Sequence, residues 1–422
     1  MPSSYLSHLQ CPVCKATYAP NTIPYTCPAC GEVGALDMVY DYAALRRDLT
    51  PATISAHQEW TMWRYRPLLP VIDDTYIPPL PVGWTPLVPA PRLAERFGLA
   101  EVWLKDDGRN PTASLKDRAS AMVVARAREI GADAITTASS GNAAAALAGV
   151  CASVGLRPVI FVPKTAPQAK VTQLLIFGAR VFLVDGTYDD AFDLSVKAAH
   201  EFGWYCRNTG MNPYTTEGKK TAAFEIAEQL GWYAPDAMLV SVGDGNIIAG
   251  QYKGFYDLHQ LGWIDHMPRL IGVQAAGSAP FVRAWEAGRD PATMPLERPK
   301  TIADSISVGF PRDRVKGMRA VRATNGAYLA VSDAAILAAI PDLARATGVF
   351  AEPAAATAYA GLKNALEHGM VRRGERVVVL ITGSGLKDIA SAIRSAESEG
   401  AKAETILPTL AAVREAMEKN PL

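Results

Sequence analysis

Four cysteines near the start of the chain are among the residues most suited to chemistry. They form two Cys-x-x-Cys pairs separated by twelve residues, namely Cys11, Cys14, Cys27 and Cys30. Four thiolates at this spacing are typical of a tetrahedral zinc ribbon, in which protein ligands fill every coordination position. Because such a closed site activates no water, we predict a structural Zn²⁺ ion whose binding helps a small module to fold. A redox-active dithiol and a four-thiolate iron site are the alternatives.

A single lysine, Lys116, is the second candidate, because it follows an expected strand at 102–104 and begins a long helical pattern. Thr112 and Ser114 are residue types that cap helices, so we expect Lys116 in the first helical turn. The helix dipole disfavours a cation there and lowers the pKa of the amine, as a lysine nucleophile requires. From the residues alone, a solvated lysine beside Asp117 is the alternative.

Three further turns carry small and polar residues where expected strands end. They are the Ser-Ser-Gly-Asn turn at 139–142, the Gly-Asp-Gly-Asn turn at 243–246 and the Thr-Gly-Ser-Gly-Leu-Lys-Asp segment at 382–388. A helix that begins at such a turn offers unpaired backbone amides and positive potential to an anion. The first two turns are therefore candidate anion sites. An ordinary capping loop at Asn142 and a simple strand-to-helix turn at 243–246 are the alternatives.

The elements that must position these residues alternate from residue 99 onward. The expected strands are 102–104, 134–137, 158–162, 181–184, 237–242, 270–274, 328–331 and 377–381. The expected helices include 120–130, 168–177, 189–202 and 220–230. This alternation predicts an α/β fold whose parallel sheet is covered by helices on both faces.

The length of 422 residues exceeds what one hydrophobic core holds, so we expect several domains. A zinc-ribbon module is expected at 1–36, and an extended arm rich in proline and tryptophan at 37–98. A catalytic region would follow at 99–400. We expect a C-terminal helix at 401–422.

The charge balance and composition exclude several kinds of partner. Lysine plus arginine and aspartate plus glutamate each number 42, whereas a nucleic-acid or anionic-membrane binder would be basic. No apolar run reaches the ~18 residues of a membrane span, and the opening residues do not resemble a signal peptide. The isolated Cys151 and Cys206 do not suggest a disulfide framework. We therefore expect a cytoplasmic enzyme that acts on a small molecule.

The segment around Lys116 resembles the cofactor-lysine motif of the fold type II pyridoxal phosphate enzymes, and most closely that of the threonine synthase branch. Five further motifs of that family occur in order along the chain, one before this segment and four after it, at 84–87, 139–142, 217–225, 243–246 and 382–388. The resemblance implies two three-layer α/β/α lobes, similar to the tryptophan synthase β fold, with the cofactor between them. The smaller lobe would cover about 111–205.

The resemblance also implies a role for each motif. Lys116 would bind pyridoxal 5'-phosphate covalently and then act as the catalytic base. The cofactor phosphate would lie on the loop formed by Gly243, Asp244, Gly245 and Asn246. The substrate carboxylate would lie on the turn formed by Ser139, Ser140, Gly141 and Asn142.

Two side chains would contact the cofactor ring. Asn142 would donate a hydrogen bond to the ring hydroxyl oxygen. Thr382 would lie at the pyridine nitrogen, where a neutral hydroxyl favours elimination and replacement over transamination, and Ser384 is the competing candidate. Glu352 resembles a family position beside the ring, but it also fits a helix that begins at Glu-Pro.

The activity implied by the resemblance is that of threonine synthase, which makes L-threonine and phosphate from O-phospho-L-homoserine and water. The sequence departs from the family at Ala143, where a hydroxyl is usual, and at Thr215, where an arginine is common. The candidate substitutes for that arginine are Lys164, Arg207, Lys219 and Lys220. The alternative is a related enzyme that eliminates or replaces a group on serine, threonine or another activated amino acid. A catalytically inactive fold that carries a zinc ribbon is a third hypothesis, and a homodimer is expected from the family.

Overall fold

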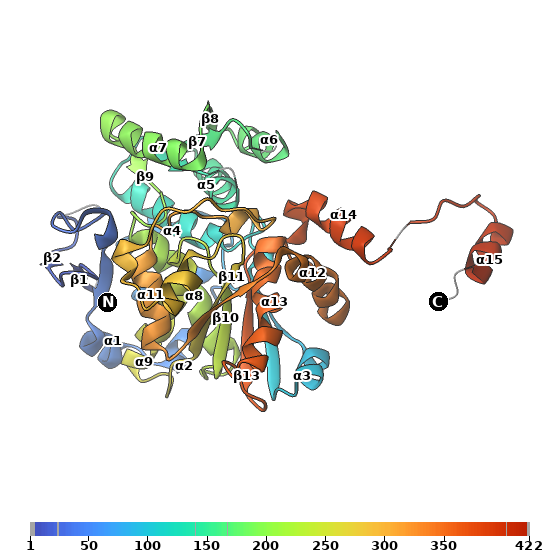
Figure 1. The fold of residues 1–422 in the computed structure, drawn as a ribbon. Coiled ribbons are helices and arrows are strands. Elements are labelled where there is room, and N and C mark those ends of the chain that lie inside the picture. The colour runs from blue at the N-terminus through green and yellow to red at the C-terminus, as the bar shows by residue number, and fades with distance from the viewer. Residues whose placement is uncertain (1–4, 23–24, 140, 167, 402, 420–422) are drawn as a thin grey trace.

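The computed structural model describes residues 5–22, 25–139, 141–166, 168–401 and 403–419. These residues form a small N-terminal sheet, two α/β lobes stacked on one another, and a C-terminal helix that stands apart from both (Figure 1). No helix among them combines the length and the apolar character needed to cross a membrane. The predicted α/β architecture is confirmed.

The smaller lobe contains a four-stranded parallel sheet in the order β8-β7-β6-β9. Its elements are β6 (Ala134–Ala138), α5 (Asn142–Ser153), β7 (Arg157–Pro163), α6 (Gln168–Ile176), β8 (Arg180–Val184), α7 (Tyr188–Phe202) and β9 (Tyr205–Cys206). Successive side chains of a strand point to opposite faces. Ile160 of β7 therefore packs with α5 and α6, whereas Val159 and Phe161 pack with α7. Both faces of this sheet are covered.

The larger lobe contains a six-stranded sheet in the order β12-β11-β10-β13-β5-β4. Its strands are β4 (Leu87–Pro89), β5 (Glu101–Asp106), β10 (Ala237–Ser241), β11 (Arg269–Ala275), β12 (Ala327–Val331) and β13 (Arg376–Ile381). Only the edge strand β4 pairs antiparallel; the other pairings are parallel. Met238 and Val240 of β10 join the core on one face, and Leu239 joins the core on the other.

Helices cover both faces of the larger sheet. Its α-helices are α3 (Pro91–Phe97), α8 (Tyr214–Gln229), α9 (Asn246–Leu261), α10 (Pro280–Glu286), α11 (Arg314–Ala323), α12 (Asp333–Thr347), α13 (Pro353–Glu367) and α14 (Ile389–Ser398). Helix α4 (Lys116–Glu129) packs against both α8 and α5 of the smaller lobe. The 3-10 helices of the chain are η1 (Gly31–Gly34), η2 (Met62–Leu68), η3 (Asp74–Tyr76), η4 (Asp107–Arg109), η5 (Pro291–Thr293), η6 (Asp304–Ile306) and η7 (Gly385–Lys387). All eight expected strands and the four expected helices are present, with ends that differ by a few residues.

The N-terminal sheet consists of β1 (Leu6–Gln10), β2 (Thr17–Tyr18) and β3 (Asp37–Tyr40), which pair antiparallel. Because β3 belongs to this sheet, the sheet extends past the expected boundary at residue 36. Two short helices follow, α1 (Tyr42–Asp48) and α2 (Pro51–Ser55).

The segment expected as an extended arm contributes to the main core. Met62, Trp63 and Tyr65 of η2 are buried against the larger lobe. The ring of Tyr65 lies 5.3 Å from that of Phe224 in α8, and its hydroxyl donates to Glu228 at 2.6 Å. This part of the chain therefore carries core side chains as well as surface ones.

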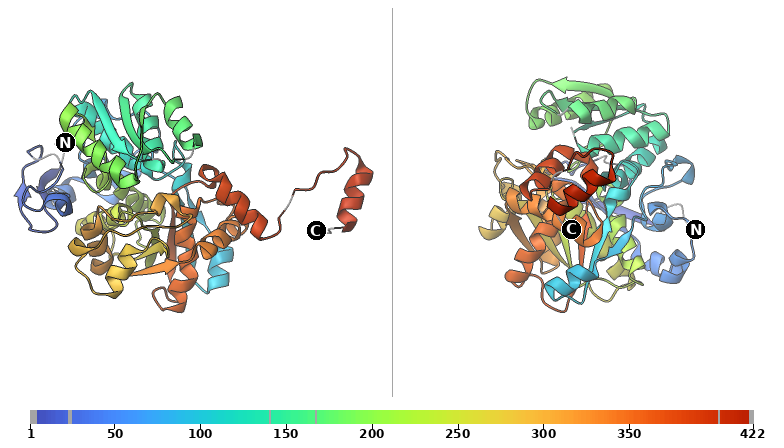
Figure 2. Two further views of the ribbon diagram at one scale, coloured as in Figure 1. Left: turned by 45° about the horizontal axis from the view of Figure 1, so that its top comes forward. Right: turned by 90° about the vertical axis from the view of Figure 1, so that its right-hand side faces the viewer.

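The C-terminal segment leaves the larger lobe after α14 and ends in α15 (Leu410–Lys419), which stands apart from the rest of the chain in Figure 1 and in the left view of Figure 2. No residue of α15 is buried. The helix is shorter than the expected 401–422, since 403–409 is not helical. Its exposed face is available for a contact outside this chain.

Candidate active site

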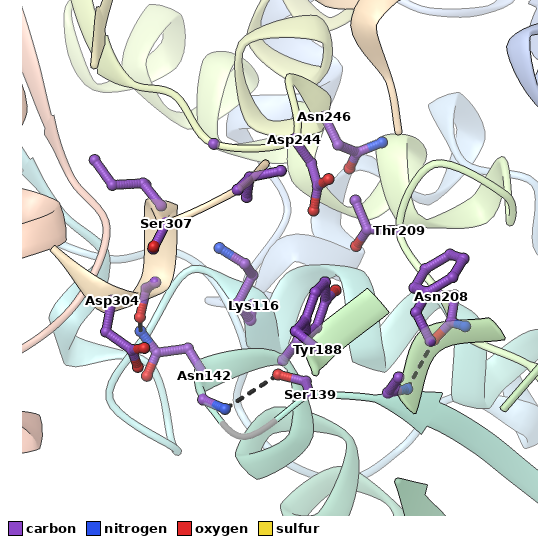
Figure 3. Close-up of a pocket in the computed structure, with 18 of the residues that line it drawn as sticks. Lys116, Ser139, Asn142, Tyr188, Asn208, Thr209, Asp244, Asn246, Asp304 and Ser307 are labelled. Atoms are coloured by element: carbon purple, nitrogen blue, oxygen red, sulfur yellow. Dashed lines mark hydrogen bonds between the residues drawn. The ribbon is translucent and has the colours of Figure 1, made fainter. Parts of the chain in front are cut away.

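A cavity of about 350 Å³ lies between the two lobes and is lined by both (Figure 3). It gathers five of the predicted site residues, Lys116, Ser139, Asn142, Asp244 and Asn246, together with the glycines at 141, 243 and 245. Ser140 lies outside the described residues. Most of the residues that sequence patterns singled out therefore meet at one place, at the carboxyl ends of parallel strands, where ligands bind in open α/β sheets.

Lys116 is the first residue of α4, in agreement with the predicted first turn. The expected capping by Thr112 and Ser114 is wrong. The hydroxyl and the backbone N–H of Thr112 both donate to the carboxylate of Asp117, and the hydroxyl of Ser114 has no partner among the described residues. Asp117 thus fixes the loop before the helix, and no side chain caps the helix itself.

A buried ion network holds α4 two residues beyond Lys116. The guanidinium of Arg118 donates to Asp107 at 2.7 and 2.8 Å and to both carboxylate oxygens of Glu225 in α8. Lys105 of β5 lies 2.6 Å from Glu225 as well. All four side chains are fully buried. Because buried ion pairs demand well-defined geometry, this network fixes the start of α4 relative to β5 and α8.

The amine of Lys116 is suited to act as a nucleophile and a base. Burial, aided by the nearby charge of Arg207, outweighs the opposing effect of Glu352 and lowers its pKa to about 8. No hydrogen bond to this amine occurs within the described ranges, and the side chain is partly exposed to the cavity. A substantial fraction of the amine is therefore neutral near physiological pH.

The turn at 139–142 precedes α5 and presents its first backbone amides. The N–H of Gly141 donates to the hydroxyl of Ser139 at 3.1 Å. The side-chain amide of Asn142 donates to Ser305 at 3.3 Å and to Glu352 at 2.6 Å, so it is already engaged across the lobes. The N-terminus of a twelve-residue helix at the cavity wall can hold a carboxylate.

The loop at 243–246 is compact because of its glycines. Gly245 has φ +90°, and a Cβ there would meet the ring of Phe281 and the carbonyl of Asp313. Asn246 begins α9 and donates to Thr216 at 2.8 Å, while Lys219 donates to its amide oxygen. Small residues allow the backbone of this loop to approach an anion closely.

Asp244 is the one acidic side chain of that loop and projects toward the cavity (Figure 3). Its carboxylate accepts a hydrogen bond from the backbone N–H of Arg312 at 3.1 Å. Burial raises the pKa of Asp244, which favours its neutral form.

The cavity wall also carries a buried cation that forms no ion pair with the described residues. Arg207 follows β9, is fully buried, and has a guanidinium nitrogen, Nη2, with no partner among the described residues. The glycine-rich turn and the lysine of low pKa together fit a ligand that carries both a phosphate and an aldehyde, and Arg207 adds a buried cation to the cavity wall.

Thr382 lies beside the lysine motif but is not one of the residues that line the cavity. Its carbonyl accepts from Leu115 N–H at 2.9 Å, and Ser114 pairs with Gly383 in an isolated bridge. The hydroxyl of Ser384 instead caps η7. Glu352 accepts from Asn142, and burial raises its pKa.

Several cavity residues were not singled out from the sequence, including Tyr188, Asn208, Thr209 and Ser307 (Figure 3). Asn208 accepts from Ala138 N–H at 2.9 Å and from Thr137 at 3.0 Å, so it joins the ends of β9 and β6. The sequence signal that could have indicated Asn208 and Thr209 is the polar Arg-Asn-Thr run at 207–209, which directly follows β9.

The four clustered cysteines come together in the N-terminal sheet. The sulfur atoms of Cys11, Cys14, Cys27 and Cys30 all lie within 4.8 Å of one another. The hydroxyl of Tyr18 lies 3.1 Å from the sulfur of Cys27. Four convergent thiols without a carboxylate or open position match a closed tetrahedral site.

Comparison with known proteins agrees with this geometry. A family model described as pyridoxal-phosphate dependent enzyme matches residues 79–383. The threonine synthase of Methanocaldococcus jannaschii is 39% identical over 389 residues, which cover 92% of this chain and 95% of that protein. The threonine synthase of Synechocystis is 41% identical over 337 residues, or 79% of this chain and 85% of that protein.

Solved structures show the same fold at lower identity. A processed threonine deaminase from Solanum lycopersicum superposes with a TM-score of 0.64 at 24% identity, covering 75% of this chain and 84% of that chain. Diaminopropionate ammonia lyase from Escherichia coli gives 0.63 at 19% identity, covering 75% and 88%. The predicted fold class is confirmed.

Proposed function

Since the chain belongs to the pyridoxal-phosphate dependent enzymes, we propose that it acts as a threonine synthase, converting O-phospho-L-homoserine and water into L-threonine and phosphate. The observation that carries the proposal is the 39% identity to a threonine synthase across 92% of the chain. The cavity supports it, because it combines a lysine of low pKa with two turns that can hold anions.

Lys116 is the residue we assign to covalent attachment of pyridoxal 5'-phosphate. We assign the cofactor phosphate to the backbone of Gly243, Asp244, Gly245 and Asn246. Asn142 and Thr382 are assigned to the cofactor ring. When bound, the cofactor supplies an electron-withdrawing ring that stabilises negative charge beside the substrate amino group.

The side chains of this chain perform the remaining work. The N-terminus of α5, with Ser139 to Asn142, binds the substrate carboxylate. The amine of Lys116 takes the proton from Cα and carries protons at Cβ and Cγ, because its pKa of about 8 lets it both accept and donate. A proton also leaves Cβ, the C–O bond at Cγ breaks and releases phosphate, and Cγ gains a proton. Water then adds its hydroxyl group at Cβ, and a proton returns to Cα to complete L-threonine.

The second candidate function is elimination on an unphosphorylated hydroxy amino acid. Two positions favour it. The side chain of Ala143 offers no hydrogen bond, and the hydroxyl of Thr215 already donates its hydrogen bond to the carbonyl of Asn212 at 2.8 Å. Neither position supplies the cation that a phosphate needs.

A substrate assay separates the two functions. The holoenzyme is given O-phospho-L-homoserine, L-serine or L-threonine, and both phosphate and 2-keto acid are measured. We expect phosphate and threonine from the first substrate, with Lys116→Ala inactive as the control. If 2-keto acid forms from serine or threonine and no phosphate is released from O-phospho-L-homoserine, the proposal of threonine synthase is wrong and the second function holds.

The cysteine cluster is proposed to hold one structural Zn²⁺ ion bound by Cys11, Cys14, Cys27 and Cys30. The convergence of the four sulfur atoms supports this assignment. The free, buried thiols of Cys151 and Cys206 fit a reducing compartment, so we place the enzyme in the cytoplasm.

A homodimer is also proposed. The exposed apolar side chains at the C-terminal end of the chain support it, with Ile389 and Ile393 of α14 exposed by 48% and 52% and Leu410 of α15 by 66%. Apolar stripes of this kind on helices that pack against little else mark protein interfaces.

A further inference from the structure

The arginine that is common in the family at position 215 is a threonine in this chain. This residue is buried in the first turn of α8, and its hydroxyl donates a hydrogen bond to the carbonyl of Asn212. It therefore supplies neither charge nor a free donor. A substrate phosphate needs a cation elsewhere on the cavity wall, because charge-assisted hydrogen bonds are the strongest means of holding one.

Two of the four basic candidates are excluded by their contacts. Lys164 is exposed, pairs with Asp185 at 3.4 Å and does not line the cavity. Lys220 is buried behind the wall, where it pairs with Asp257 at 2.8 Å and with Glu217. The charge of each lysine is already matched by a carboxylate.

Lys219 of α8 also lines the cavity, but its amine is engaged by the 243–246 loop. Its amine donates to the side chain of Asn246, the last residue of the 243–246 loop. Burial also lowers the pKa of Lys219 well below its usual value, so its positive charge is weakened. The hydrogen bond from Lys219 therefore helps to fix the 243–246 loop.

Arg207 differs from the other three in having a buried side-chain nitrogen without an acceptor among the described residues. Its side chain is 0% exposed. Nη1 donates to Thr209 at 3.0 Å and Nε to Ser120 at 3.4 Å, while Nη2 has no acceptor in the described part of the chain. A buried guanidinium without a counter-ion is costly, so the site is built to receive an anion.

The place of Arg207 in the smaller lobe favours a substrate anion over the cofactor phosphate. The residue follows β9 in the smaller lobe, next to β6, whose end carries the turn at 139–142. Asn208 ties the two strand ends together through Ala138 and Thr137. Arg207 therefore lies on the lobe that carries the expected substrate carboxylate site, whereas the 243–246 loop belongs to the other lobe.

We propose that Arg207 binds the phosphate group of the substrate through its unpaired Nη2 and thereby replaces the arginine that is absent at position 215. The assignment to a substrate phosphate rests on the proposed function. Arg207 keeps its charge at neutral pH, since burial lowers its pKa only to about 10.

The test compares the holoenzymes of Arg207→Gln, Arg207→Lys and a control, Lys164→Gln. Calorimetry measures the Kd of inorganic phosphate, the assay gives KM and kcat for O-phospho-L-homoserine, and absorbance gives cofactor content. Loss of a charge-assisted hydrogen bond predicts roughly 10- to 100-fold higher Kd and KM for Arg207→Gln, with unchanged cofactor content. Arg207→Lys should show a smaller increase in both Kd and KM. Lys164→Gln should have the same Kd, KM and cofactor content as the parent chain.

Unchanged phosphate affinity in Arg207→Gln, or loss of cofactor in place of phosphate affinity, would overturn the proposal. If that variant does not fold, Arg207→Lys decides, because an altered donor geometry should still raise KM several-fold and an unchanged KM refutes the role. Phosphate binding that depends on Arg207 in an enzyme that never releases phosphate from O-phospho-L-homoserine would refute the proposed function and leave the anion site standing.

Discussion

At the scale of single residues, the pKa of the Lys116 amine depends on its surroundings in the fold more than on its sequence neighbours. The sequence places it at a helix N-terminus, where the dipole already opposes a cation. The structure adds burial and the charge of Arg207, and together these lower the pKa of its amine to about 8. Solvation beside Asp117, the alternative from the residues alone, is not found, because Asp117 is engaged by Thr112.

This pKa predicts how cofactor attachment depends on pH. An ordinary lysine becomes neutral only near pH 10.5, whereas Lys116 loses its proton as pH rises through about 8. When the cofactor is added to apoenzyme, the rate of attachment should therefore rise through pH 8 and level off. Absorbance after rapid mixing gives this rate. A rate that still climbs steeply between pH 9 and 10 would contradict the assignment.

At the scale of elements, the position of Lys116 depends on how α4 packs against α8. Gly218 of α8 lies so close to α4 that a Cβ there would collide with the carbonyl of Arg118. The same contact carries the ion network of Arg118, Asp107 and Glu225. This explains why a glycine and an acidic residue occur together in the 217–225 motif.

Arg118→Met should destabilise the fold and displace α4. The variant leaves Asp107 and Glu225 with buried charges that lack their main partner, so the free energy of unfolding should fall by about 3–5 kcal/mol. Denaturant unfolding measures this loss. Lys363→Met is the control, since its pair with Glu367 is 74% and 57% exposed and should be worth at most about 1 kcal/mol. Equal effects of the two variants would show that the network does not hold the element.

The N-terminal sheet is a second element whose stability we expect to depend on a ligand. Cys27→Ser should remove the bound zinc, whereas Cys151→Ala should retain one equivalent because Cys151 lies in the core of α5. Metal analysis of the purified variants measures this. Loss of zinc should also weaken the contact of Asp37 with Arg319, because β3 is held by the same sheet. One equivalent of zinc in Cys27→Ser would contradict the site.

The strands and the first helical turn of α4 could be predicted because β-rich runs and small residues act locally. The partners of individual polar groups could not. The sequence offers Thr112 and Ser114 as caps, yet the hydroxyl of Thr112 is taken by Asp117. Arg207 appeared only as one of four basic candidates, since which of them keeps an unpartnered buried nitrogen depends on contacts between distant segments.

At the scale of the whole molecule, ion pairs link the two lobes. Lys170 of α6 pairs with Asp304, and Arg312 pairs with Asp189 of α7 at 3.0 Å. Arg312 also donates its backbone N–H to Asp244. The relative position of the lobes is therefore coupled to the 243–246 loop.

The exposed C-terminal helices predict the oligomeric state. A chain that ends at residue 400 lacks α15 and should dissociate more readily, because apolar area is lost from the proposed interface. Analytical ultracentrifugation over a range of concentrations measures the change. Identical association of the full and shortened chains would exclude α15 from the dimer contact.

The central claim is that the amine of Lys116 carries the cofactor. Reduction of the holoenzyme with borohydride, followed by proteolysis and mass spectrometry, locates the attachment directly. We expect one pyridoxyl group per chain on the peptide that contains Lys116, and none in Lys116→Ala. A pyridoxyl group on Lys219 or another lysine, or no modified peptide at all, would contradict the account.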